Sequence, residues 1–377
     1  MDEQSEQRDA FRPSVISVSS AALEHNVNAI RELVKPALLA VPIKANAYGH
    51  GILPIAQQLA QLDVDMLCVA TAEEALLLRD NGITTSIFLL SEPPRDAIEP
   101  CYQADVTFTV YTADTIEALA SISSPNKPAH VHLKVDTGMN RVGMEPQDTL
   151  DFIQRIIDHE TLFFEGLYTH FATSEDAEHP LCATQLERFE RVLEVVETAG
   201  LTPPLIHAAN SGAALRIAST RFSMVRVGLS SYGVYPHPSY SDLIDLRLVL
   251  SLTTKISFVK NAYVGETISY GARYKVTKDT RIATLPLGYG DGVPRNLGLL
   301  GGSVIVEGMR CPVVGAVTMD QMMIDVGDLP VSVGDRVTLL GTDGDVTISP
   351  VEWADHLGTI SYEILCALGE RLPRSYD

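Results

Sequence analysis

The sequence predicts an α/β fold: a (β/α)8 barrel of the TIM type, followed by a mainly β domain. Over residues 20–249, eight short apolar runs alternate with amphipathic segments. Reactive side chains gather directly after these runs, and from residue 250 onward alternating runs separated by glycine and aspartate turns take over. A chain of 377 residues is long enough for one large domain and a smaller one. We therefore expect domains at residues 1–249 and 250–377.

The first predicted element is a helix capped by Ser19 or Ser20, with Leu23, Val27, Ile30 and Val34 on one face. Amphipathic segments at Thr71–Asn81, Asp148–His159 and Ala183–Ala199 predict further helices. A doubly wound sheet is the alternative, but it normally has fewer strands and a glycine-rich dinucleotide turn, which the sequence lacks. The expected barrel strands are Leu38–Ile43, Met66–Ala70, Ser86–Leu90, Val106–Val110, His130–Val135, Phe163–Thr169, Pro204–Ala208 and Met224–Leu229.

The second half of the chain predicts strands and then two short helices. Ser349-Pro350 is a cap and first-turn signal for one helix, and Ser361 is a candidate cap for the other. The expected strands lie at Leu252–Val259, Arg281–Leu287, Ser303–Val306 and Arg336–Leu340.

Composition excludes several classes of function. The formal net charge of −20 and the isoelectric point of about 4.8 argue against nucleic acid or an anionic membrane as a partner, because both require basic patches. The five cysteines show no CxxC pair or zinc spacing, so we expect no metal site and reduced thiols in a cytoplasmic protein. The segment Met1–Phe11 lacks the pattern of a signal peptide, and no apolar run is long enough to span a membrane.

Reactive residues follow the predicted barrel strands. Lys44 ends the first strand within VPIKANAYGHG, where a lysine is either an ordinary strand-end residue or one placed to form a Schiff base with a carbonyl. In a barrel, residues after the strands share one face, where active sites form. The others are Tyr48 after strand one, Lys134, Asp136 and Arg141 at strand five, His170 after strand six, Asn210 and Ser211 after strand seven, and Arg226 in strand eight.

Nine strings together resemble the bacterial alanine racemases over nearly the whole chain. They are VPIKANAYGHG at Val41, HLKVDTGMNRVG at His132, LYTHFA at Leu167, HAANSGA at His207, MVRVGLSSYGVYP at Met224, ISYGARY at Ile268, LPLGYGDG at Leu285, VTMDQ at Val317 and ISYEILC at Ile360. The resemblance implies interconversion of L- and D-alanine with pyridoxal 5'-phosphate, to supply D-alanine for peptidoglycan.

The resemblance also implies roles for the residues that hold the cofactor. Lys44 would bind the cofactor covalently and move the α-proton of the D-enantiomer. Arg226 would face the ring nitrogen, held by His170; since arginine keeps its proton, it can only donate a hydrogen bond there. The groups implied to hold the phosphate are Tyr48, Ser211, Gly228, Leu229 and Tyr362.

Substrate binding and the second base are implied in the same way. Arg141 would bind the substrate carboxylate, and Lys134 matches a lysine that is carbamylated in many members, which would give Arg141 an anionic partner. Tyr270 would be the base for the L-enantiomer. In the family, the β domain of one subunit covers the barrel mouth of the other, so the resemblance implies a homodimer with shared active sites. The neighbouring chain would supply Tyr270, Tyr289, Met319 and Asp320.

Some positions depart from the family pattern. Asn140 replaces a common glycine, and Ser231 replaces a common apolar residue. Ala316 stands where many members carry an entrance arginine, although Arg295, another entrance position, is retained. We expect this loss to lower the positive potential at the entrance and to widen it, which leaves substrate selectivity open.

Three other functions remain open at this point. A broader amino-acid or serine racemase shares the same catalytic groups. A barrel-fold pyridoxal decarboxylase would need an acid against the ring nitrogen and a reactive C-terminal cysteine, and Arg226 and Tyr270 argue against it. A non-catalytic pyridoxal-binding barrel often lacks a β domain, so residues 250–377 argue against that reading.

Overall fold

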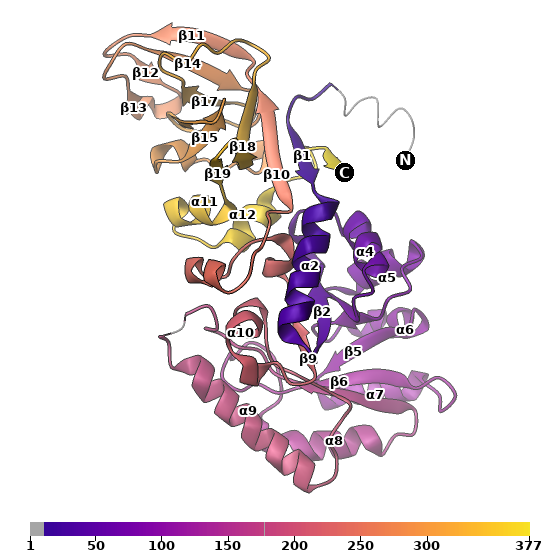
Figure 1. Cartoon of the computed structure of the whole chain (residues 1–377). Helices are drawn as coiled ribbons and strands as arrows, with labels where there is room; N and C mark the ends of the chain where they lie inside the picture. Colours follow the sequence, from indigo (N-terminus) through magenta and orange to yellow (C-terminus); the bar gives the residue numbers. More distant parts are fainter. Residues whose placement is uncertain (1–10, 177) are drawn as a thin grey trace.

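The computed structural model describes residues 11–176 and 178–377, and its first part is a closed barrel of eight parallel strands (Figure 1). The last barrel strand pairs with the first, so the sheet has no free edge. All eight predicted strands are confirmed. They are β2 (Leu38–Pro42), β3 (Met66–Val69), β4 (Ile87–Leu89), β5 (Val106–Val110), β6 (Ala129–Lys134), β7 (Leu162–Tyr168), β8 (Leu205–His207) and β9 (Met224–Arg226).

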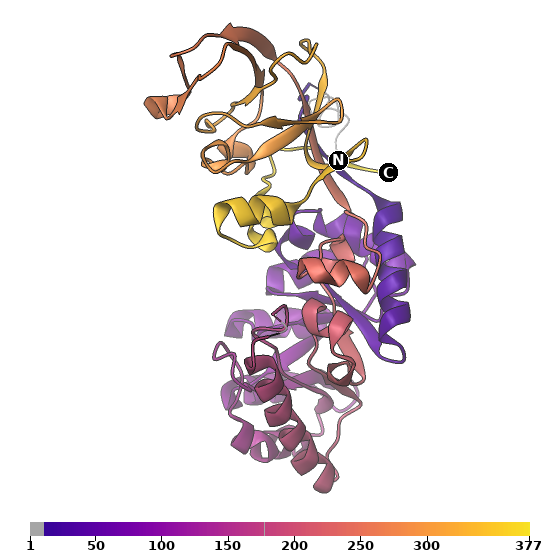
Figure 2. The ribbon, with the colours of Figure 1, turned by 60° about the vertical axis from the view of Figure 1, so that its left-hand side comes forward.

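Amphipathic helices surround the barrel (Figures 1 and 2). The first, α2 (Ser20–Val34), begins at the N-cap Ser19, whose hydroxyl accepts the Ala22 N–H. The predicted face of this helix is confirmed, because Leu23, Val27, Ile30 and Val34 are all buried. The other helices are α4 (Ile52–Gln61), α5 (Ala72–Asp80), α6 (Arg95–Gln103), α7 (Ala113–Ile122), α8 (Thr149–Ile157), α9 (Leu181–Thr198) and α10 (Ser211–Arg216).

The second part is mainly β, as predicted. Its largest sheet has the strand order β16-β15-β18-β10-β1-β20, with β19 paired to β18. Two smaller sheets have the strand orders β11-β14-β17 and β12-β13. The strands are β10 (Leu250–Lys255), β11 (Phe258–Ala262), β12 (Thr267–Ile268), β13 (Tyr274–Lys275), β14 (Thr280–Leu285), β15 (Ser303–Val306), β16 (Met309–Pro312), β17 (Met322–Asp325), β18 (Arg336–Asp343), β19 (Val346–Ile348) and β20 (Arg374–Tyr376).

Two details of this domain differ from the prediction. The run Leu252–Val259 is two strands in different sheets, because Ile256 N–H binds the carbonyl of Asp335 whereas Ser257 N–H binds that of Thr284. The two C-terminal helices, α11 (Pro350–Leu357) and α12 (Ser361–Ala367), are present. Ser349 caps α11 as expected, but α12 has Ile360 at its N-cap and no capping side chain, so Ser361 is its first residue.

Strand β1 (Val15–Val18) precedes the barrel in the chain but belongs to the large sheet of the second domain. It pairs antiparallel with β10 and parallel with β20, so both ends of the described chain enter that sheet. The expected boundary after residue 249 coincides with the start of β10. The prediction that Met1–Phe11 is no signal peptide concerns residues that, except for Phe11, lie outside the described part of the chain.

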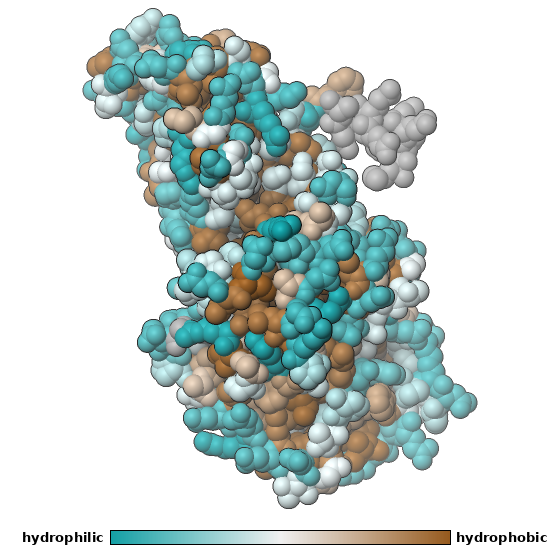
Figure 3. Space-filling model, viewed as in Figure 1, coloured by the Kyte–Doolittle hydropathy of each residue, from teal (hydrophilic) through white to brown (hydrophobic). Residues whose placement is uncertain are grey.

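The surface is mixed in character. On the face in Figure 3, hydrophilic residues cover most of the barrel and of the second domain, and hydrophobic ones gather toward the middle of the molecule. Within the described residues, no helix combines the length and the apolar character that a membrane crossing requires. All five cysteines are free thiols, four of them buried and Cys366 exposed.

Candidate active site

Lys44 begins an unusual turn, α3 (Lys44–Tyr48), directly after β2. The next four residues, Ala45 to Tyr48, have φ of 52–55°, which makes this a left-handed turn. Such a turn costs roughly 1–2 kcal/mol per residue. Two side chains fix it: Glu74 Oε1 accepts the Ala45 N–H at 2.6 Å, and Asn46 Oδ1 accepts the Ile52 N–H at 2.8 Å. Backbone strain that the surroundings hold in place is typical of functional sites.

Four cationic side chains crowd together at the C-terminal end of the barrel: Lys44, Lys134, Arg141 and Arg226. Burial and the nearby Arg141 lower the pKa of Lys44. Burial, Arg226 and Arg141 lower the pKa of Lys134 to about 7. Like charges this close disfavour one another unless an anion is bound among them. The arrangement therefore favours ligands that carry negative charge.

A second group of residues forms a cradle beside this cluster. A Cβ added to Gly228 would lie 2.6 Å from the Tyr48 hydroxyl, so only glycine leaves this space open. Ser211 Oγ accepts the Ser230 N–H at 3.5 Å, which places its hydroxyl beside the same backbone segment. The rings of Tyr48 and Tyr362 lie 5.8 Å apart. Within residues 11–176 and 178–377, the N–H groups of Gly228 and Leu229 donate no hydrogen bond to a protein acceptor.

Arg226 is buried at the end of β9, and its guanidinium is held from several sides. Nη2 donates to the carbonyls of Thr169 at 2.8 Å and Ala208 at 3.1 Å, and to His170 Nδ1 at 3.1 Å. The bond to His170 agrees with the sequence-based expectation. Burial and Arg226 hold the pKa of His170 well below its usual range, so this imidazole is neutral and can accept the bond.

A chain of hydrogen bonds that the sequence did not reveal runs from Arg226 through the barrel interior. Arg226 Nη1 lies 2.5 Å from His207 Nδ1, and His207 Nε2 lies 2.8 Å from His132 Nδ1. His132 Nε2 in turn lies 3.2 Å from Glu165 Oε2. Since arginine only donates, both neutral histidines must carry their proton on Nε2. Every bond therefore points from Arg226 toward the Glu165 carboxylate, which serves as a remote counter-charge for the buried guanidinium.

The only sequence signal for this chain of bonds was the presence of polar residues inside barrel strands that otherwise read as apolar. His132 lies in β6, Glu165 in β7 and His207 in β8, and both histidines are fully buried. Their spacing along the sequence is too wide to reveal the contact. The ring of Tyr168 stacks on His207 with 4.6 Å between the ring centres and lies 5.0 Å from the Arg226 guanidinium. Tyr168 therefore covers one side of the chain of hydrogen bonds.

Glu165 should stabilise the fold in a pH-dependent way. Burial alone would raise its pKa, but hydrogen bonds from His130 and His132 outweigh burial and lower the pKa to about 2. An unfolded glutamate titrates near 4.3. The stabilisation is therefore present above about pH 4.3 and is lost as the pH falls toward 2. We expect Glu165→Gln to lower the free energy of unfolding at pH 7 by roughly 1–3 kcal/mol.

Denaturant unfolding of both proteins at pH 7 and near pH 3 checks this expectation. The difference between wild type and Glu165→Gln should shrink at the lower pH, and a difference that stays constant would contradict the assignment. Glu190→Gln, at an exposed position of α9, is the matched control and should change little at either pH.

The remaining predicted residues lie in the second domain, away from the barrel site of their own chain. Tyr270 lies between β12 and β13, and Figure 1 shows these two strands at the end of that domain away from the barrel. It is 72% exposed, and Tyr289 and Met319 are 42% and 53% exposed. The structure thus brings the barrel residues together but does not bring Tyr270 to Lys44 within one chain.

The entrance positions also lie in this domain. Ala316 is buried, and its carbonyl accepts a hydrogen bond from the hydroxyl of Ser269 at 2.6 Å, next to Tyr270. Arg295 is exposed. Elsewhere, a cavity of about 690 Å³ lies where the end of the barrel meets the second domain, but none of the predicted site residues lines it. In the described part of the chain, no group of three or more His, Cys, Asp or Glu side chains could hold a metal ion.

Comparison with known proteins decides the family. The model of the alanine racemase N-terminal domain matches residues 18–236, and that of the C-terminal domain matches residues 249–376. The chain belongs to the alanine racemase family. A relative named alanine racemase from Desulfovibrio desulfuricans is 38% identical over 368 residues, which cover 97% of this chain and 98% of that protein. One from Geobacillus kaustophilus is also 38% identical, over 97% of this chain and 94% of that protein.

Solved structures of the alanine racemase family have the same fold. The enzyme from E. faecalis superposes with a TM-score of 0.90 at 35% identity, and the match covers 97% of this chain and 99% of that one. The alanine racemase from Bacillus anthracis with bound L-Ala-P gives a TM-score of 0.88 at 34% identity, covering 97% of this chain and 95% of that one. The resemblance noted in the sequence is therefore confirmed as family membership.

Proposed function

We propose that this protein is an alanine racemase that uses pyridoxal 5'-phosphate and two bases on opposite faces of the substrate to interconvert L- and D-alanine. The observation that carries the proposal is the cluster of Lys44, Lys134, Arg141 and Arg226 beside the cradle at Gly228. A phosphate and a substrate carboxylate are the anions that such a site would take. Membership of the alanine racemase family supports the reading, and the comparisons do not favour a broader or serine racemase.

The residues present fit the cofactor. The cradle has an open space over Gly228, and the backbone N–H groups of Gly228 and Leu229 are available to a phosphate. The hydroxyls of Tyr48, Ser211 and Tyr362 would complete this set of phosphate ligands. When bound, pyridoxal phosphate stabilises negative charge at the α-carbon of an amino acid.

Lys44 would hold the cofactor covalently, and its free amine would move the α-proton of the substrate on one face. Its lowered pKa suits this task, because the uncharged amine is the form that both attacks a carbonyl and accepts a proton. Tyr270 of the partner subunit moves the proton on the opposite face. Each base contributes roughly 10²–10⁴-fold to the rate.

Arg226 would offer the ring nitrogen of the bound cofactor a hydrogen bond, and because arginine keeps its proton it would not protonate that nitrogen. His170 and the chain of bonds to Glu165 hold this guanidinium in place. Arg141 binds the substrate carboxylate together with the backbone N–H of Met319 from the partner subunit. Tyr289 and Asp320 of the partner subunit complete the wall of the site.

The assembly that follows is a homodimer in which each barrel, residues 1–249, is covered by the other chain's β domain, residues 250–377. The exposure of Tyr270, Tyr289 and Met319 supports it, because these residues have no reacting group to serve on their own chain. Five free cysteines support a cytoplasmic location, where D-alanine would be made for peptidoglycan.

Lys134 should be carbamylated in mildly alkaline solution. With a pKa of about 7, its amine is mostly uncharged at pH 8 and can add carbon dioxide, which forms the N–C bond and releases one proton. The resulting anion would pair with Arg141. Protein in ¹³C-bicarbonate at pH 8 should show a carbamate carbon signal by NMR that fades as the pH falls below 7. A signal that persists in Lys134→Met would contradict the assignment.

A racemisation assay on the purified protein tests the function directly. With added pyridoxal phosphate, L-alanine should be converted to an equal mixture of enantiomers far faster than L-serine or L-lysine. Comparable turnover of all three would favour the broader racemase. Release of carbon dioxide, or no turnover at all, would contradict the proposal.

A further inference from the structure

We propose that Asp291 is a positioning residue, which holds the loops of Tyr289 and Met319 where they reach the partner subunit's barrel. The inference rests on the proposed dimer with shared sites. Asp291 lies in the GYGDG string, and the resemblance implied no role for it. Among the residues that the structure describes, it is the only carboxylate that is buried.

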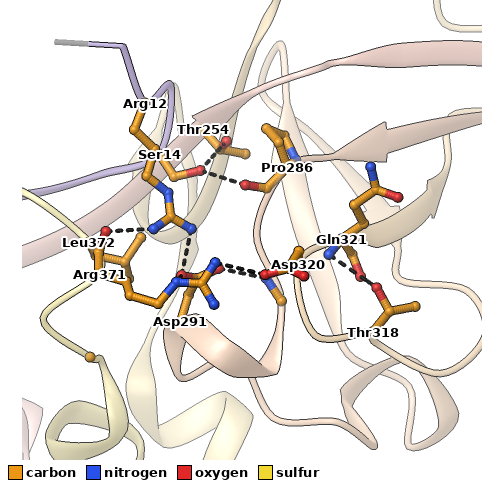
Figure 4. A network of polar contacts seen from close by, with 12 residues as sticks. Arg12, Ser14, Thr254, Pro286, Asp291, Thr318, Asp320, Gln321, Arg371 and Leu372 are labelled. Atoms are coloured by element: carbon orange, nitrogen blue, oxygen red, sulfur yellow. Dashed lines mark hydrogen bonds and ion pairs between the residues drawn. The ribbon is translucent and has the colours of Figure 1, made fainter. Parts of the chain in front are cut away.

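Both oxygens of Asp291 are engaged (Figure 4). Oδ1 accepts a hydrogen bond from Arg12 Nη2 at 2.5 Å and lies 3.3 Å from Arg371 Nε. Oδ2 accepts the N–H of Gly288 at 3.0 Å. Arg12 also donates to the carbonyl of Arg371 at 2.5 Å, so residues near both ends of the chain converge on this carboxylate.

The loops of Tyr289 and Met319 are joined to each other directly behind Asp291. The N–H of Tyr289 binds the carbonyl of Thr318 at 2.9 Å, and the N–H of Gly290 binds that of Met319, also at 2.9 Å. The contact is so close that a Cβ on Gly288 would lie 2.1 Å from the Thr318 carbonyl oxygen. The two loops therefore move as one unit.

Arg371 secures the far side of this unit. Its Nη2 donates to Asp320 Oδ1 at 2.7 Å while its Nε faces Asp291, so one guanidinium spans both loops. Two aspartates and two arginines balance in charge. Removing the buried carboxylate would leave Arg12 and Arg371 without their shared partner and release the Gly288 turn. A loop shift of about 1 Å is enough to lower turnover about 10²-fold.

The first test replaces Asp291 by asparagine, which keeps the shape and an acceptor for Gly288 but removes the charge. We expect kcat/KM to fall about 10²-fold, with a raised KM because Met319 helps to bind the substrate carboxylate. Covalent attachment of pyridoxal phosphate to Lys44 should be unchanged, because that residue lies in the other half of the chain. Unchanged kinetics would overturn the inference.

The matched control is Glu352→Gln. It removes an ion pair of the same domain, that of Arg310 with Glu352 at 2.6 Å, which lies on other elements of the domain, β16 and α11. It should leave kcat/KM within about twofold of wild type. If Asp291→Asn does not fold, Arg371→Met is tested in its place. We expect kcat/KM to fall only about tenfold in this variant, because Arg371 is half-exposed and its ion pair with Asp291 contributes less than a buried pair.

Mixed dimers separate positioning from a general effect on folding. Chains carrying Asp291→Asn are paired with chains carrying Lys44→Ala, and the heterodimer is isolated by two different tags. One of its sites combines an intact Lys44 with intact loops from the partner, so about half of wild-type activity should return. A heterodimer as slow as the Asp291→Asn homodimer would overturn the inference.

A second heterodimer, of Lys44→Ala and Tyr270→Phe chains, distinguishes a failure of the role of Asp291 from a failure of the proposed shared site. If the heterodimer of Lys44→Ala and Tyr270→Phe chains recovers activity while the Asp291→Asn pair does not, only the role of Asp291 fails. If neither pair recovers, the shared site itself fails.

Discussion

Replacing Lys44 by alanine should remove covalent attachment of pyridoxal phosphate and lower racemisation of alanine by more than about 10⁴-fold. Both effects are expected because the amine of Lys44 binds the cofactor covalently and also moves the α-proton on one face. No other lysine can substitute, because the only other lysine in the cluster, Lys134, ends a different strand and is buried against the ring of Tyr168.

The attachment is measured by reducing the protein with borohydride in the presence of pyridoxal phosphate and mapping the labelled peptide. Wild type should carry the label on the peptide that contains Lys44, and the variant should carry none in the site. Lys260→Ala, at an exposed position of β11, is the control and should leave both label and activity intact. An active Lys44→Ala variant with normal cofactor absorbance would end the assignment.

Replacing Tyr270 by phenylalanine should lower racemisation in both directions by roughly 10²–10⁴-fold while leaving the cofactor attached. The hydroxyl is the only group lost, and it belongs to a residue that is 72% exposed on its own chain, so the fold should tolerate the change. Racemisation needs a proton removed on one face and returned on the other. Loss of one base therefore stops both directions.

Solvent deuterium distinguishes the two bases. In Tyr270→Phe, the α-hydrogen of D-alanine should still exchange through Lys44, whereas exchange into L-alanine should fall with the racemisation rate. Tyr263→Phe, another exposed tyrosine of the same domain, is the control and should behave as wild type. Exchange into L-alanine at the wild-type rate would show that Tyr270 is not the base for that enantiomer.

The barrel could be predicted because most residues of its strands are buried and most of the strands read as short apolar runs. The second domain was harder. Strand β1 has only four residues, and its partners β10 and β20 lie more than 230 residues away in the chain. The change of sheet at Ile256 depends on which carbonyl each N–H meets, which an alternating pattern cannot reveal.

The positions of Lys44, Arg141 and His170 at one end of the barrel were predictable, because these residues follow barrel strands. The chain of hydrogen bonds from Arg226 through His207 and His132 to Glu165 could not be predicted. Its members face inward from separate strands, and only the closed barrel brings them together. Asp291 was missed for a similar reason. Its partners Arg12 and Arg371 lie near opposite ends of the sequence.

The central claim is that one active site is built from two chains, and a mixed dimer of Lys44→Ala and Tyr270→Phe chains tests it most directly. Each homodimer should be nearly inactive. In the heterodimer, one site has both substitutions and the other has neither, so the account predicts recovery of about half the wild-type activity. A heterodimer that stays as inactive as its parents would show that Lys44 and Tyr270 act within the same chain or not together at all.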